Sequence, residues 1–363
     1  MSIGTQYPPE WTTSRDTLTG RTIRQYTASP AHSYPLYYFT PSITPENDLL
    51  VFHSEREGTV QLYCMDLASG DITLLTNGRT PDSNWKIWSP RPTTGNYDHL
   101  SVLNGPRREV SYFQGNEIRT THLDTLENRH LHTLGDRLCI SQNSASPDGR
   151  HLAFVHVNRD NYADAIGERD RFMQGNWERH YDWRKTVAST IGVVDCTTES
   201  YRDVLALDFH VHHVIFVDNE TLLINHARDT PGMWIVRLDG TGVRTLRPVD
   251  EHGWVVHQVV TARGIFYEAV AHKGGEHHSW FGCYQTQTDT FSETELPFSG
   301  YVHTGFDPLG ETTFFEHHGD SHQLVRIHDF GDPEKQSLEI LRTMPPYPAD
   351  QPGQYCHAHP FMT

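Results

Sequence analysis

A short segment near the C-terminus carries two histidines and a glutamine at a spacing that could bind a metal ion. His357 and His359 are two residues apart, so in an extended strand their side chains would point to the same side. Gln354 joins them only if a turn or bulge intervenes, and Pro352 with Gly353 favours such a turn. Two imidazoles and an amide oxygen suit Mn, Zn, Fe or Ni better than Ca. Because the chain has 25 histidines, surface or hydrogen-bonded histidines are the competing interpretation.

Composition excludes several classes of partner. The net charge of -17 argues against nucleic acid, which needs a basic footprint, and it requires local cations if the substrate is an anionic sugar. No stretch approaches the 18 or so apolar residues of a membrane span, and the first residues lack the basic and apolar regions of a secretion signal. The five cysteines are scattered and odd in number, which predicts reduced thiols in a cytoplasmic compartment.

The elements that would position such a metal site form a repeat. One unit consists of a strand, a turn that usually contains Asp, and a second strand, which is the pattern of a β-hairpin. It occurs at residues 63–75, 121–128, 191–199 and 234–242, with looser copies at 283–288 and 324–329. A second unit, a polar turn followed by an apolar strand, occurs at residues 45–52, 146–155 and 218–224.

Strand pairs that recur every few tens of residues are typical of β-propeller blades. Six recognisable units and the segment around His357 predict an all-β fold, a seven-bladed β-propeller in which residues 1–363 form one domain. An array of β-sandwiches is the alternative, and the single continuous repeat disfavours it. One insertion, at about 158–185, interrupts the third blade and is expected on a loop face, where it could form a wall of the site or a solvated excursion.

These motifs resemble the oligogalacturonate lyases, seven-bladed β-propellers that cleave short pectic uronides by β-elimination with a divalent metal, typically Mn. The resemblance extends from Thr19 to Thr363. It is carried by the Gln-x-x-His-x-His-Pro segment at 354–360, by His303 ahead of a turn, by residues 157–160 with the insertion after them, and by residues 233–236.

The resemblance implies the following roles. The metal ligands are His303, Gln354, His357 and His359, and the expected ion is Mn²⁺. His257 falls where the family has its catalytic base, although Gln258 follows it instead of the family's usual Glu.

The resemblance also implies an arginine directly before Met233, but this chain has Gly232 there. Arg228, four residues upstream, is the candidate replacement, and a surface salt bridge is the competing interpretation of this residue. Among the remaining histidines, His213 is expected to begin an inner strand of the fourth blade, and we predict it as a substrate contact.

The chemistry explains why these residue types would be needed. Cleavage removes a proton next to a carboxylate, and a divalent cation on that carboxylate stabilises the resulting negative charge, while a neutral histidine accepts the proton. The sequence therefore predicts a lyase that acts on short uronic-acid oligosaccharides and yields a 4,5-unsaturated product. A non-catalytic sugar-binding or scaffold propeller is the main alternative. A glycoside hydrolase would need two carboxylates about 5–9.5 Å apart, and no such pair stands out.

Overall fold

The computed structural model describes residues 1–17, 19–31, 33–78, 100–161, 187–211, 213–225, 232–273, 276–296, 302–306, 313–318, 322–328, 335 and 337–344. Among these residues the regular structure is almost entirely antiparallel β-sheet, which confirms the predicted all-β class. No helix in the described part of the chain is long and apolar enough to cross a membrane.

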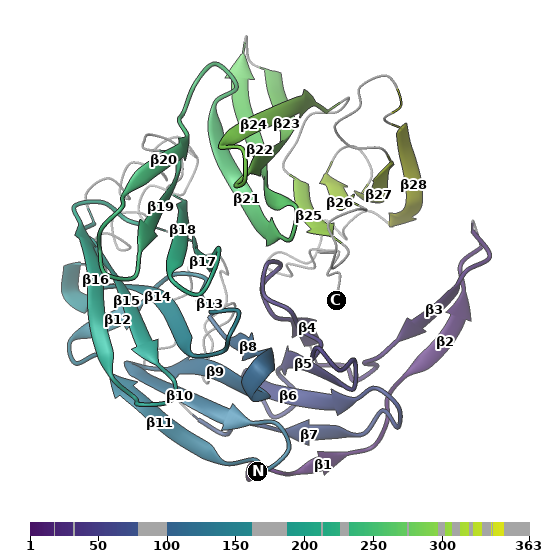
Figure 1. The fold of residues 1–363 in the computed structure, drawn as a ribbon. Helices are drawn as coiled ribbons and strands as arrows, with labels where there is room; N and C mark the ends of the chain where they lie inside the picture. Colours follow the sequence, from purple (N-terminus) through teal and green to yellow (C-terminus); the bar gives the residue numbers. More distant parts are fainter. Residues whose placement is uncertain are drawn as a thin grey trace.

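Six consecutive sheets follow one another along the chain, and Figure 1 shows them arranged around a common axis. The first sheet has the order β1 (Gln6–Tyr7), β7 (Ile72–Leu74), β6 (Gln61–Asp66), β5 (Leu49–Ser54) and β4 (Ser33–Pro35). The second has the order β11 (Asn128–Thr133), β10 (Glu117–His122), β9 (Glu109–Gln114) and β8 (Val102–Asn104), with a short 3-10 helix η1 (Gly105–Arg107) after β8. The third contains β12 (Arg137–Cys139), β13 (Ser144–Ala145), β14 (His151–Asn158), β15 (Ser189–Asp195) and β16 (Tyr201–Leu207).

The last three sheets each have four strands in sequence order. The fourth consists of β17 (His213–Phe216), β18 (Thr221–Asn225), β19 (Met233–Arg237) and β20 (Arg244–Arg247). The fifth consists of β21 (Trp254–Thr261), β22 (Gly264–Lys273), β23 (Glu276–Gln285) and β24 (Thr290–Glu295). The sixth consists of β25 (Val302–Phe306), β26 (Thr313–His318), β27 (His322–His328) and β28 (Ser337–Met344).

The repeated Asp of the sequence has a structural role in the turn between the third and fourth strands of a sheet. Oδ1 of Asp66 accepts hydrogen bonds from the backbone N–H groups of Ala68 and Ser69, at 2.8 and 2.7 Å. Oδ1 of Asp195 binds the equivalent groups of Thr197 and Thr198 at 2.8 and 3.0 Å. Such Asx turns hold a tight reversal without help from neighbouring sheets, which explains why this short motif is readable in the sequence.

The cores lie between consecutive sheets. On β17, Val214 and Phe216 pack into the cluster shared with the third sheet, whereas Ile215 packs into the cluster shared with the fifth. This alternation follows from the two-residue period of a strand, whose successive side chains face opposite sides. Each face of the fourth sheet is therefore covered by a neighbouring sheet. The burial of each such side chain contributes about 1.5–3 kcal/mol to the free energy of unfolding.

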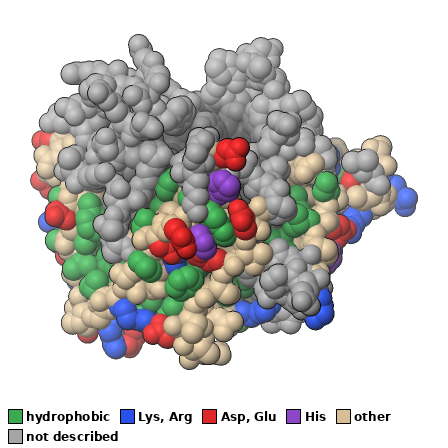
Figure 2. Space-filling model, turned by 90° about the horizontal axis from the view of Figure 1, so that it is seen from above, with side chains coloured by type: hydrophobic (Ala, Val, Ile, Leu, Met, Phe, Trp, Pro, Cys, Tyr) green, Lys and Arg blue, Asp and Glu red, His purple; other side chains and the backbone are tan. Residues whose placement is uncertain are grey.

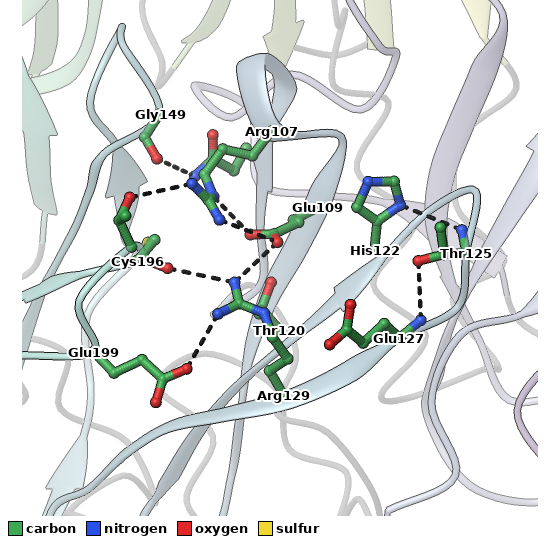
Figure 3. A network of polar contacts seen from close by, with 12 residues as sticks. Arg107, Glu109, Thr120, His122, Thr125, Glu127, Arg129, Gly149, Cys196 and Glu199 are labelled. Atoms are coloured by element: carbon green, nitrogen blue, oxygen red, sulfur yellow. Dashed lines mark hydrogen bonds and ion pairs between the residues drawn. The ribbon is translucent and has the colours of Figure 1, made fainter.

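A buried ion pair network ties the second sheet to the third. Figure 3 shows the Glu109 carboxylate between two guanidinium groups, with Arg107 Nε at 2.9 Å and Arg129 Nη2 at 2.9 Å. Arg129 also reaches the turn after β15, where it donates to the carbonyl of Cys196 and pairs with Glu199 at 3.1 Å. Because Glu109 is 5 % exposed, removal of either arginine would leave a buried carboxylate with fewer partners.

The N-terminal hairpin lies between the first and sixth sheets (Figure 1), where a seventh blade would stand. It is formed by β2 (Thr12–Arg15) and β3 (Thr22–Gln25). Tyr26 packs on the face of the first sheet that is turned away from the second sheet. Arg21 pairs with Glu339 of β28 at 3.6 Å. Seven blades in a single domain stays a prediction, because residues 345–363 lie outside the described part.

The last residues of the inner strands β8, β17, β21 and β25 line one cavity, so these strands run in the same direction along the axis. They begin at the opposite end of the axis, which we call the site end. Residues 162–186 connect β14 to β15, and residues 226–231 connect β18 to β19. Asn158, which precedes the first connection, pairs with Arg137 at the start of β12, and Asn225, which precedes the second, pairs with His213 at the start of β17. Both connections therefore leave the described sheets at the site end.

Candidate active site

A bulge on β21 positions the predicted catalytic base. Val256 pairs with Glu268 of β22, and pairing resumes at Val259 with Phe266, so His257 and Gln258 together oppose one residue of β22. His257 has a φ of 53°, a left-handed conformation that is uncommon for residues other than glycine. Bulges with such a residue turn a side chain away from the regular alternation of a strand, and they are frequent beside active sites.

The bulge brings the His257 imidazole against a buried carboxylate. Nδ1 of His257 lies 2.8 Å from Oε2 of Glu268, and the side chains are 12 % and 0 % exposed. In the neutral ring, Nδ1–H donates this hydrogen bond to the carboxylate, and Nε2 is then the nitrogen that can accept a proton. This arrangement of base and orienting carboxylate is the one expected of a general base.

Glu268 is a candidate functional residue that the motifs did not identify. A signal was present, since it is the one charged residue in the otherwise apolar stretch from Ile265 to Ala271, and a carboxylate is rarely buried in a strand without a partner.

A turn formed by residues 37–40, which we call the aromatic turn, is the inner wall of this region. After β4 the chain makes a turn in which Thr40 N–H donates to the carbonyl of Tyr37 at 2.7 Å. The ring of Tyr38 meets the ring of His257 edge-on, with centroids 5.8 Å apart. The hydroxyl of Tyr38 donates to the carbonyl of Gln258 at 3.4 Å. The turn thus reaches from the first sheet to the fifth across the axis, as Figure 1 shows for the segment after β4.

His213 begins the inner strand β17 of the fourth sheet, as predicted, and it contacts the same turn. Its Nε2 lies 3.1 Å from the hydroxyl of Tyr37, and its Nδ1 lies 3.5 Å from Oε1 of Gln258. Its role as a substrate contact stays a prediction. The two ring nitrogens have protein partners, so contact with a sugar would come from the edge of the ring that is still accessible, and His213 is 6 % exposed.

The predicted metal ligand His303 lies on β25, the innermost strand of the sixth sheet, where it pairs with Glu316. Strands β21 and β25 are in contact, so the backbone that carries His303 is next to the strand that carries His257. The other predicted ligands, Gln354, His357 and His359, lie outside the described residues. Within the described ranges no cluster of three or more His, Cys, Asp or Glu side chains could hold a metal ion.

The backbone at Gly232 bears on why this chain lacks the arginine that the lyase resemblance implies directly before Met233. It has a φ of 81°, and a Cβ at this position would lie 2.4 Å from the carbonyl oxygen of Arg247. An arginine therefore does not fit at position 232 without movement of the backbone. The candidate replacement, Arg228, lies outside the described residues, but its described neighbours Asn225 and Met233 pair with each other beside His213.

The far end of the axis is apolar. A cavity of about 660 Å³ there is lined by residues that include Phe39, Ile43, Val217 and Val260. Tyr38 and Phe39 line this cavity and also contact His257 and His213, so the aromatic turn separates the cavity from the site end.

On the outside, Figure 2 shows acidic and histidine side chains gathered among apolar ones on the face it presents, with Lys and Arg nearer its margins.

The cysteines show no reactive thiol among the described residues. Cys64, Cys139, Cys196 and Cys283 are reduced and buried, which agrees with the prediction of free thiols. Burial raises the pKa of the Cys64 and Cys283 thiols to about 11 and that of Cys139 and Cys196 to about 12. These four groups are therefore protonated near neutral pH and do not act as nucleophiles.

Comparison with known proteins relates this geometry to a known fold. No model of a known protein family matches the sequence, and no curated protein matches it. An oligogalacturonate lyase structure in complex with manganese has a TM-score of 0.74 and 17 % identity, covering 90 % of this chain and 84 % of that one. A second oligogalacturonate lyase, from Vibrio parahaemolyticus, has a TM-score of 0.74 and 16 % identity, covering 94 % and 87 %.

A structure of a prolyl endopeptidase is also similar, with a TM-score of 0.56 and 9 % identity, but only 50 % of that chain is covered. The predicted resemblance is thus confirmed in three dimensions. The chain has the propeller-like fold of the oligogalacturonate lyases.

Proposed function

We propose that the protein is a metal-dependent lyase that cleaves short uronic-acid oligosaccharides by β-elimination and releases a 4,5-unsaturated product. The observation that carries this proposal is the His257–Glu268 pair on the bulge of β21. It supplies an oriented base at the end of the axis where the strand of His303 also begins. The shared fold with oligogalacturonate lyases supports the same reaction class.

The proposed elimination gives His257, Arg228 and Glu268 separate roles. Nε2 of His257 takes the proton from C5 of the uronate, the C4–O bond breaks, and the electron pair forms the C4–C5 double bond. The departing oxygen takes a proton from water, and Arg228 is the candidate that donates hydrogen bonds to this oxygen and to the substrate carboxylate. Glu268 holds the imidazole in the tautomer that accepts the proton and stabilises the imidazolium that results.

A divalent ion fits the donor set that the sequence provides. Three imidazoles and an amide oxygen form a neutral set that suits Mn²⁺, and His303 lies on an innermost strand at the site end, where such a set could converge. His303, Gln354, His357 and His359 would hold the ion. When bound, it would supply positive charge to stabilise the negative charge that develops on the substrate carboxylate.

Short substrates fit the surroundings of the site best. The connections at 162–186 and 226–231 both leave the sheets at the site end, and the aromatic turn blocks passage along the axis. We therefore propose that the enzyme acts at the end of a short oligosaccharide.

The test is incubation of the protein with Mn²⁺ and a panel of galacturonide and glucuronide oligomers while the ultraviolet absorbance of a 4,5-unsaturated product is recorded. A rise in absorbance that His257→Asn abolishes supports the lyase. Binding of uronides without product would favour a non-catalytic sugar-binding propeller, in which the His257–Glu268 pair would be structural.

A further inference from the structure

Two buried side chains next to His213 carry polar atoms that have no hydrogen-bond partner among the described residues. They are Nε2 of Gln258 and Oδ1 of Asn225. Gln258 is 0 % exposed and Asn225 is 3 % exposed. An unpaired buried polar atom costs about 1–3 kcal/mol, so a native protein normally provides it with a partner such as water or a ligand.

Both side chains face the interface between the fourth and fifth sheets. Asn225 is directly opposite His213 in the β17–β18 pair, so the two side chains are on the same face. That face includes Ile215, which packs into the core shared with the fifth sheet. From the fifth sheet, Oε1 of Gln258 approaches Nδ1 of His213 at 3.5 Å. Asn225 and Gln258 therefore both lie beside His213, one from the same sheet and one from the facing sheet.

The hydrogen bonds around His213 determine which atom of the Gln258 amide is left to bind a ligand. Burial raises the pKa of the Tyr37 hydroxyl, so this group keeps its proton and can donate to Nε2 of His213. The ring proton is then on Nδ1, which donates to Oε1 of Gln258. The Nε2 of Gln258 remains as a donor and Oδ1 of Asn225 as an acceptor.

We propose that Gln258 and Asn225 form a subsite that binds a hydroxyl group of a sugar ring beside His257. A hydroxyl can accept one hydrogen bond and donate another, so it has the two roles that the Gln258 donor and the Asn225 acceptor require. A carboxylate would satisfy only the donor, because it has no proton to give to Asn225. The inference rests on the proposed function and deepens it: Gln258 directly follows the proposed base, so this subsite would orient the ring whose C5 proton His257 removes.

The test separates ligand binding from turnover. In the His257→Asn background with Mn²⁺, calorimetry measures the affinity for digalacturonate and for the neutral dimer of galactose. Asn225→Leu keeps the size of the side chain and removes the unpaired oxygen. We expect it to weaken the binding of both sugars about threefold to tenfold, the equivalent of one neutral hydrogen bond, while the melting temperature stays the same or rises.

Two controls make the result specific. Asn104→Leu removes another buried oxygen that has no partner among the described residues, but on β8, whose last residue is at the far end of the axis, and it should leave affinity unchanged. Gln258→Met removes the donor and also the contact with His213. Its affinity is therefore compared with that of Tyr37→Phe, which loosens His213 from the other side but leaves both subsite atoms in place.

The possible outcomes decide the subsite and the function separately. Unchanged affinity in Asn225→Leu and Gln258→Met, with sugar binding intact in the background protein, overturns the subsite even if wild-type protein forms product. Weakened binding in both variants supports the subsite even if wild-type protein forms no product, a result that would reject the lyase alone. Failure of the protein to bind either sugar would overturn both.

Discussion

The imidazole of His257 and the carboxylate of Glu268 are hydrogen-bonded at 2.8 Å although the regular pairing of their strands would keep them apart. The register partner of Glu268 is Val256, so in an unbroken ladder the next residue, His257, would face the other side of the sheet. The bulge and the positive φ of His257 turn its ring back to the carboxylate. The candidate base therefore depends on a local irregularity of the backbone.

His257→Asn should remove the base with little damage to the fold, because Asn tolerates a left-handed φ. We expect kcat to fall by about 10²–10⁴-fold with metal content unchanged. The measurement combines steady-state kinetics with elemental analysis. Wild-type turnover in the variant would exclude His257 as the base, and loss of the metal would identify it as a ligand. His257→Val is the contrasting variant, and its β-branched side chain should lower the melting temperature.

Glu268→Gln should act as the loss of a positioning group. The amide keeps the shape of the side chain but cannot stabilise an imidazolium, so we expect kcat to fall at least about tenfold while KM changes less than about twofold. A purely structural role would lower the melting temperature and leave kcat per folded molecule at the wild-type value. Glu268→Asp, which retains the charge, should recover part of the lost kcat.

Gly232→Arg tests whether the structure excludes an arginine from this position. The left-handed φ and the nearby carbonyl of Arg247 predict a loss of at least about 2 kcal/mol in the free energy of unfolding. Gly58→Ala is a suitable control, since its φ is also positive but no atom lies within 4 Å of the added Cβ. Chemical denaturation of the two variants gives the comparison, and an equal loss would show that backbone conformation alone is responsible.

Asp195 should contribute to stability in a way that depends on acid pH. Burial by itself would raise its pKa, but the backbone N–H groups of Thr198 and Thr197 and the Arg150 guanidinium together lower it from 3.8 to about 2. Because the folded-state pKa is below the unfolded one, this contribution is complete above about pH 4 and is lost as the pH falls toward 2. Asp195→Asn should therefore flatten the fall in unfolding free energy over that range. A wild-type slope in the variant would contradict this account.

The sequence was sufficient for the features that depend on local interactions. The Asp turns at Asp66 and Asp195 are built from neighbouring residues. His213 begins an inner strand because a continuous apolar run, Val214 to Val217, follows it directly. The pairing of His257 with Glu268 depends on a bulge and on strand register. The contact of Tyr37 with His213 joins residues 176 positions apart. No spacing rule within one sequence encodes such contacts.

The most direct test of the central claim is the appearance of a 4,5-unsaturated product from digalacturonate. Protein stripped with a chelator and reloaded with Mn²⁺ is compared with stripped protein and with reloaded His257→Asn, and absorbance is followed in parallel with mass spectrometry of the products. The account predicts unsaturated product from the reloaded wild-type protein alone. Absence of this product from the reloaded wild-type protein with every galacturonide and glucuronide oligomer tested, or equal product from the His257→Asn variant, would contradict it.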